Sequence, residues 1–114
     1  MSDCLFCQIV AGEIPAELEY EDDEIVAFRD INPQAPVHLL VIPRRHIETL
    51  LDTQDEDAGL LGRLQRVGVE LARRHGLEGR GFRLVTNCLK EAGQSVFHIH
   101  LHVLGGRVMG WPPG

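Results

Sequence analysis

The residues of this chain best suited to chemistry are three histidines at alternate positions, His98, His100 and His102. Successive side chains of a β-strand point to opposite faces, so on a strand all three imidazoles would project from one face. Imidazole titrates near neutrality, and such a row could supply a base, an acid, a nucleophile or metal ligands. The alternative is a row of solvated histidines on an exposed strand. The apolar residues that alternate with them would pack into a core on the other face: Phe97, Ile99, Leu101 and Val103.

A second constellation is the pair Cys4-x-x-Cys7, which has the spacing of a zinc knuckle. One such pair is only half of a tetrahedral site, and His46 and His98 could complete it as a Cys₂His₂ set. The alternative is two reduced cysteines buried near a core. A structural disulfide is not expected in a cytosolic chain. Cys88 has no partner in the sequence and receives no role.

The whole chain has the size and composition of one globular domain, which we place at residues 1–114. A protomer of 114 residues has a large surface for its volume, and dimerisation would reduce it. The formal charge of −6 argues against broad nucleic-acid binding, which usually needs a basic face. No apolar run approaches membrane-spanning length and no signal-like stretch opens the chain, so we expect a cytoplasmic protein with no membrane partner.

Two helices are expected to support these residues. Ser2 or Asp3 can cap a short helix, and Gly12 can end it. The segment Thr53–Glu56 has the spacing of a capping box, and Gly76 fits the C-terminal cap of the longer helix that follows. The apolar stripe of that helix comprises Leu60, Leu61, Leu64, Val67 and Leu71.

Five strands are also expected, separated by turns and proline-containing loops. The predicted strands are Leu18–Glu21, Ile25–Phe28, Val37–Ile42, Phe82–Thr86 and Val96–Leu104. The predicted fold class is therefore α+β, with a five-stranded, mainly antiparallel sheet, one long helix and one short helix.

The chain also resembles a known family. The segment His98–Leu104 matches the pattern His-φ-His-φ-His-φ-φ, with φ apolar, that names the histidine triad (HIT) superfamily. The ending Trp111–Gly114 resembles the Hint branch of that superfamily. The other segments that look like HIT proteins, in order, are Cys4–Cys7, Gly12–Pro15, Ala27–Pro33, Pro36–His38, Val41–His46, Gly93–Val96 and Leu104–Arg107.

The resemblance implies a covalent mechanism. The middle histidine of the triad, here His100, would attack the α-phosphorus of a nucleotide and form a nucleotidyl-histidine that water then cleaves. A backbone carbonyl on the histidine strand would accept a hydrogen bond from the other nitrogen of the ring and fix the tautomer. His102 and His38 would lie beside the phosphate, and the Ser95 hydroxyl would contact the leaving atom.

The resemblance also assigns the residues that bind the nucleotide. Asn87 and the loop Gly93-Gln94-Ser95-Val96 would contact the phosphate, together with His100 and His102. Asp30 would accept the ribose hydroxyls. The nucleoside would lie over Phe28, Ile31 and Leu40, with Leu5, Phe6, Ile9 and Ile14 nearby.

For the second constellation, the resemblance to bacterial-type HIT proteins implies a structural zinc held by Cys4, Cys7, His46 and His98. Four protein ligands close a tetrahedral site and leave no position for a substrate. No organic cofactor is expected.

Taken together, these features predict a Hint-type enzyme that cleaves the P–N bond of AMP-linked amines, acts on a purine nucleotide and forms a homodimer. Dinucleoside polyphosphate hydrolysis and nucleotidyl transfer are alternatives within the superfamily. Two rivals come from other classes. One is a metallohydrolase in which two triad histidines bind a catalytic zinc, and the other is a nucleotide-binding or partner-binding module with little catalysis.

Overall fold

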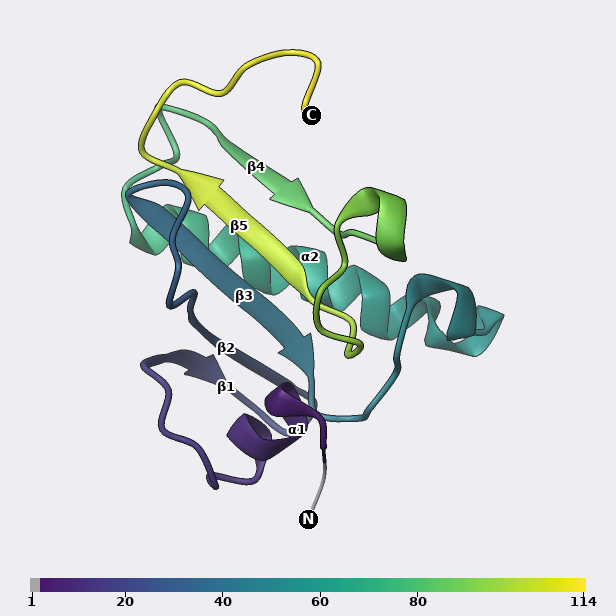
Figure 1. Ribbon diagram of the computed structural model, residues 1–114. Coiled ribbons are helices and arrows are strands. Elements are labelled where there is room, and N and C mark those ends of the chain that lie inside the picture. The colour runs from purple at the N-terminus through teal and green to yellow at the C-terminus, as the bar shows by residue number, and fades with distance from the viewer. Residues whose placement is uncertain (1–2) are drawn as a thin grey trace.

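Five antiparallel strands form one sheet in the computed structural model, which describes residues 3–114 (Figure 1). Their order across the sheet is β1-β2-β3-β5-β4. The α+β class and the five-stranded antiparallel sheet are therefore confirmed. The strands are β1 (Leu18–Glu21), β2 (Ile25–Arg29), β3 (Val37–Pro43), β4 (Phe82–Val85) and β5 (Leu101–Gly105).

The two faces of the sheet have different partners because side chains alternate along each strand. The long helix α2 (Ala58–Arg74) runs behind the sheet and covers one face (Figure 1). Its buried Leu64, Val67 and Leu71 pack there in one core cluster with strand residues such as Leu39 and Val103. The short helix α1 (Leu5–Val10) contributes Phe6 to the core on the opposite face. The strand residues of this second cluster are Val26, Phe28, Leu40 and Ile42.

The helix caps differ in part from the predicted ones. The cap of α1 is Cys4, whose Sγ accepts a hydrogen bond from the Cys7 backbone N–H at 3.2 Å. Asp3 therefore does not cap this helix, and Ser2 lies outside the described residues. Gly12 and Gly76 follow the C-caps of the two helices with φ of +75° each, as the predicted terminations require.

The predicted capping box at Thr53 and Glu56 is wrong. Two short 3₁₀ turns, η1 (Leu50–Asp52) and η2 (Asp55–Asp57), precede α2 and shift the capping contact by one residue. The Thr53 hydroxyl donates instead to the Leu50 carbonyl at 2.7 Å. The Asp57 carboxylate accepts the Gln54 backbone N–H at 2.8 Å.

The last strand is the largest difference from the sequence prediction, because β5 begins at Leu101 rather than Val96. The ladder between β3 and β5 ends where Val41 pairs with Leu101, and the Ile99 N–H then donates to the Ile47 carbonyl at 2.7 Å. His98 and His100 thus precede the strand. Phe97 is 46 % exposed and does not join the core, although Ile99, Leu101 and Val103 are buried in it.

Smaller boundary differences affect three other strands. Strand β2 extends one residue further than predicted and so does β3, whereas β4 ends one residue earlier, at Val85. Within residues 3–114, no helix combines the length and the apolar character needed to cross a membrane.

Candidate active site

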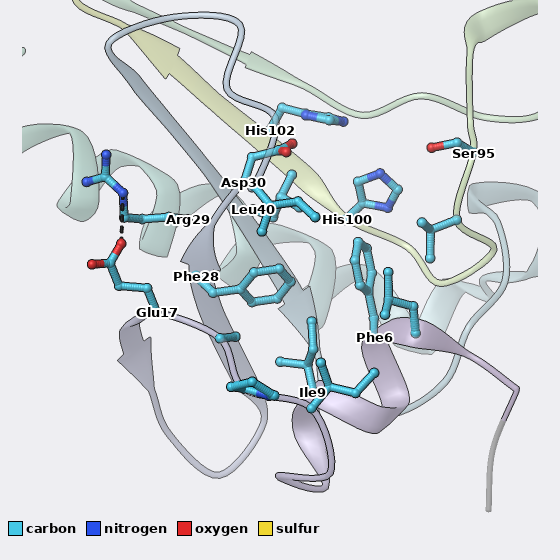
Figure 2. Close-up of a pocket in the computed structure, with 16 residues that line it drawn as sticks. Phe6, Ile9, Glu17, Phe28, Arg29, Asp30, Leu40, Ser95, His100 and His102 are labelled. Carbon is cyan, nitrogen blue, oxygen red and sulfur yellow. Dashed lines mark ion pairs between the residues drawn. The ribbon is translucent and has the colours of Figure 1, made fainter.

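A cavity of about 430 Å³ opens on the face of the sheet that carries α1 (Figure 2). His100, His102 and Ser95 line one side of it, and Figure 2 shows the rings of Phe6 and Phe28 forming apolar walls. The chain segments that meet there are α1, residues 14–17 before β1, the end of β2, the middle of β3, and β5 with the residues that precede it. The remaining lining residues are Leu5, Ile9, Ile14, Pro15, Ala16, Glu17, Arg29, Asp30, Ile31, Leu40 and Val96.

His100 is held in one tautomer at this cavity. Its Nδ1 lies 2.8 Å from the backbone carbonyl oxygen of His98, so Nδ1 carries the proton and donates it. The lone pair is therefore on Nε2. Burial lowers the pKa of His100 from its ordinary value, and the hydrogen bond to the carbonyl opposes this shift. The ring is a neutral imidazole near pH 7, which is the form that a nucleophile needs.

A chain of hydrogen bonds determines which ring nitrogen carries the proton in His38 and in His102. The Gln34 backbone N–H donates to Nδ1 of His38 at 2.9 Å, so the proton of His38 is on Nε2. That Nε2–H donates to Nδ1 of His102, also at 2.9 Å, and lies 3.4 Å from Oδ2 of Asp30. His102 consequently carries its own proton on Nε2, and this ring lines the cavity as a hydrogen-bond donor.

The pKa values of this pair are lowered. Burial lowers the pKa of His38, against the opposing charge of Asp30. Burial, with smaller contributions from His100 and His38, lowers the pKa of His102 to about 4. Both imidazoles are therefore neutral at physiological pH.

The loop before the triad divides into residues that face the cavity and residues that do not. Ser95 and Val96 line it, whereas Asn87 and Gly93 are not among the lining residues. The Gln94 side chain is buried and holds the loop together. Its Oε1 accepts the N–H of Leu89 at 2.8 Å, and its Nε2 donates to backbone carbonyls of residues 48 and 96 at 2.7 and 3.2 Å. This amide therefore shapes the loop and does not face the cavity.

The other part of the cavity is suited to a nucleoside. Phe28 and Leu40 are buried in its wall, and Asp30 lies at its edge beside His102 (Figure 2). Ile31 also lines it but is 98 % exposed, so it can only form part of the rim.

Four lining residues were not anticipated from the sequence: Pro15, Ala16, Glu17 and Arg29. Glu17 and Arg29 form an ion pair of 3.0 Å, and the Arg29 N–H donates to the Glu17 carbonyl at 3.1 Å. The signal that could have found them is the pairing of β1 with β2, which brings the segment after Ile14 alongside the end of β2.

Cys4, Cys7, His46 and His98 meet at a second site. The Sγ atom of Cys7 lies 3.2 Å from Nδ1 of His46 and 3.4 Å from Nδ1 of His98, and Sγ of Cys4 also lies 3.4 Å from Nδ1 of His98. The two Nδ1 atoms are 3.3 Å apart. A tetrahedral zinc with ordinary bond lengths would separate such ligand atoms by roughly 3.3–3.6 Å.

The tautomer of His98 also suits this residue to act as a metal ligand. Its Nε2–H donates to the Pro43 carbonyl at 2.7 Å, which leaves the lone pair of Nδ1 directed at the two thiols and His46. Burial lowers the pKa of His98, so the ring is neutral. A carbonyl that orients the far side of a histidine ligand is a common feature of zinc sites. These four residues therefore suit zinc.

A further group, Asp30, His38 and His102, also brings its ligand atoms within 4.8 Å of one another. The hydrogen bonds oppose metal binding there. His38 accepts a backbone N–H at Nδ1, so the nitrogen it would offer to a metal carries a proton. This observation weighs against a metal at these three residues, of which only His102 belongs to the triad.

Comparison with known proteins places this chain in one family. Residues 3–110 match the family model described as "Scavenger mRNA decapping enzyme C-term binding". A HIT-like protein of Synechocystis is 51 % identical over 112 residues, which cover 98 % of this chain and 97 % of that protein.

Solved structures of HIT proteins have the same fold as this chain. A HIT family hydrolase from Legionella pneumophila superposes with a TM-score of 0.96 and is 54 % identical, covering 98 % of this chain and 100 % of that one. A zinc-bound histidine triad family protein from Mycobacterium smegmatis gives a TM-score of 0.81 and 42 % identity, covering 92 % of this chain and 76 % of that one. The chain belongs to the histidine triad (HIT) family, and the resemblance seen in its motifs is confirmed.

Proposed function

We propose that this chain is a hydrolase of the Hint branch that cleaves the P–N bond of a purine nucleoside phosphoramidate, such as an AMP-linked amine. One observation carries the proposal. His100 is fixed by the His98 carbonyl with the lone pair of Nε2 available, at a cavity that also contains the hydroxyl of Ser95 and the carboxylate of Asp30. The Legionella neighbour, whose name describes a hydrolase, supports an enzymatic role.

In the first step, Nε2 of His100 forms a bond to the α-phosphorus and the P–N bond to the amine breaks. The departing nitrogen takes a proton from solvent and leaves as the amine, while the Nε2–H of the neutral His102 donates a hydrogen bond to it. In the second step, water attacks the phosphorus, its proton passes to solvent, and His100 recovers its lone pair. Ser95 donates a hydrogen bond at the reacting phosphate, and His38 keeps His102 in the donor tautomer.

The nucleotide would lie along the cavity with its phosphate at the histidines. Apolar walls of Phe28 and Leu40 suit the flat face of a purine, and Asp30 can accept both ribose hydroxyls. Ile31 would cover the rim. The backbone of residues 93–96 would bind phosphate oxygens, and Asn87 would join these contacts as the loop adapts to the substrate.

Zinc would have a structural role in this protein. Bound by Cys4, Cys7, His46 and His98, it would pin α1 to the sheet and supply no chemistry at the phosphorus. The zinc named for the Mycobacterium neighbour supports this assignment. We also propose that residues 1–114 are one HIT domain that forms a homodimer.

A second candidate function is the hydrolysis of dinucleoside polyphosphates. The matched family model is named for an mRNA decapping enzyme, and a cap joins two nucleosides through a polyphosphate. The same nucleophile would serve, but the leaving group would be a phosphate in place of an amine.

The experiment that separates the two candidates compares kcat/KM for nucleoside phosphoramidates and diadenosine polyphosphates with one purified enzyme. We expect the phosphoramidates to be cleaved faster by at least about tenfold, a difference of about 1.4 kcal/mol in transition-state stabilisation. A preference for the polyphosphates would favour the second candidate. Binding of AMP with no turnover of either class would identify a binding module.

A further inference from the structure

Phe6 lies between the candidate metal centre and the candidate nucleophile. Its ring centroid is 5.1 Å from that of His100, at an interplanar angle of 89°, and 6.0 Å from that of His98. It also contacts Phe28 edge-on at 5.4 Å. The side chain is buried and lines the cavity beside His100, as Figure 2 shows. One aromatic ring thus touches the metal centre, the nucleophile and the wall of the nucleoside cavity.

The position of Phe6 depends on the two cysteines that flank it. Helix α1 has only 6 residues, and an isolated helix of this length is not stable in water. Cys4 caps its first turn through Sγ, and Cys7 lies within that turn. A metal bound to both thiols and to His46 and His98 would fix the helix on the sheet. Without the metal, the helix still contacts the sheet through the apolar Phe6, its buried side chain, and the two thiols still lie 3.2–3.4 Å from Nδ1 of His46 and His98.

We propose that Phe6 is a positioning residue that couples the metal centre to the nucleotide cavity. Zinc bound at Cys4 and Cys7 holds the Phe6 ring against His100 and closes the apolar wall, so zinc raises the affinity for a nucleotide. Because binding free energies are reciprocal, a nucleotide raises the affinity for zinc by the same factor. This inference rests on the proposed nucleotide site.

The matched variants are Phe6→Leu and Val10→Ala. Leucine keeps an apolar side chain in the core but lacks the flat ring that stands against His100. Val10 belongs to the same helix and packs on the same cluster, but it is not among the residues that line the cavity. Loss of coupling in the first variant alone would therefore point to the ring, and not to a general loosening of α1.

The first measurement is the Kd of AMP by calorimetry for zinc-loaded and metal-free protein. We expect zinc to tighten AMP binding by about tenfold in the wild type, within the usual range of coupling between sites. Val10→Ala should retain this factor, and Phe6→Leu should reduce it to less than about twofold. The ¹⁵N chemical shifts of the His100 ring should change on zinc binding in the wild type and much less in Phe6→Leu.

The second measurement uses only the zinc-loaded protein, so it remains valid if the metal-free chain unfolds. The rate of zinc transfer to a chelator is compared with and without saturating AMP, and we expect AMP to slow it, because a higher affinity is expressed mostly as slower dissociation. Equal zinc release with and without bound AMP would overturn the coupling, and full coupling in Phe6→Leu would overturn the role of the ring. A zinc-loaded protein that binds no AMP would refute the nucleotide site itself.

Discussion

The Nδ1 atom of His100 donates a hydrogen bond to the backbone carbonyl oxygen of His98 at 2.8 Å. The side chain of His98 belongs to the zinc-type cluster, so one residue contributes its imidazole to one site and its carbonyl to the other. The tautomer of the candidate nucleophile is thus set by the main chain. A substitution of the His98 side chain leaves that carbonyl in place, whereas it removes a ligand from the metal centre.

The first prediction concerns the nucleophile. His100→Ala should lower kcat by several orders of magnitude while AMP still binds, because the variant has no nitrogen to form the covalent intermediate. Mass spectrometry of wild-type enzyme quenched during turnover should detect a nucleotide on His100. Turnover of the variant close to that of the wild type would contradict the covalent mechanism.

The second prediction concerns the metal. Protein as purified should carry about one zinc per chain, and Cys4→Ser or Cys7→Ser should lose it because serine is a poor zinc ligand. Loss of a ligand that binds only the folded state should also lower the Tm. Cys88→Ser is the matched control, since Cys88 lies outside the cluster, and it should keep its zinc. Zinc-free wild-type protein whose melting does not respond to added zinc would refute the site.

The third prediction follows from the buried histidines. The pKa of His102 is about 4 in the folded chain and about 6.5 in an unfolded one, so between these values the unfolded chain binds more protons. Stability should therefore fall as the pH is lowered from about 6.5 toward 4. Partial exposure of the ring reduces the effect, and we expect His102 to account for on the order of 1–3 kcal/mol of this loss.

Urea denaturation at several pH values tests this prediction. His102→Gln cannot take up a proton, so its free energy of unfolding should decline less steeply over that interval than that of the wild type. Parallel curves for the two proteins would mean that the folded state does not depress the pKa of His102. His38 and His100, whose pKa values burial also lowers, act in the same direction and should leave a residual slope in the variant.

The strands and the separation of the two faces were predictable from the sequence because alternation is a local property. The period of two along β3 is enough to place Leu39 on one face and Leu40 on the other. The beginning of β5 was not predictable in this way. It depends on where the partner strand stops supplying hydrogen bonds and on the Ile47 carbonyl, which takes the N–H of Ile99 from a distant part of the chain.

The candidate site also combines features that the sequence predicts with features that depend on contacts between distant parts of the chain. The triad and the cysteine pair are local motifs, and both are visible in the sequence. The orientation of the Gln94 side chain is not visible there, because the sequence does not show whether the amide of a glutamine in such a loop faces a ligand or the loop itself. Here both ends of the amide are used by Leu89 and by two carbonyls of the surrounding chain. Likewise, Glu17 enters the cavity wall only through the pairing of two strands.

The last prediction concerns the C-terminal segment. Arg83 on the edge strand β4 donates to the Gly110 carbonyl at 2.9 Å, and the C-terminal segment runs along the outer side of β4 (Figure 1) with Trp111 83 % exposed. The resemblance to the Hint branch implies that in the proposed homodimer this segment would reach toward the neighbouring active site and meet the leaving group there. A chain ending at Gly110 should stay dimeric, because we expect β4 and α2 to supply the main interface. Its ratio of kcat/KM for bulky and small amines should change, since selectivity is a difference of transition-state free energies.

An unchanged ratio in a dimeric truncation would show that the segment only packs on the surface. A monomeric but fully active truncation would refute a site completed by the partner.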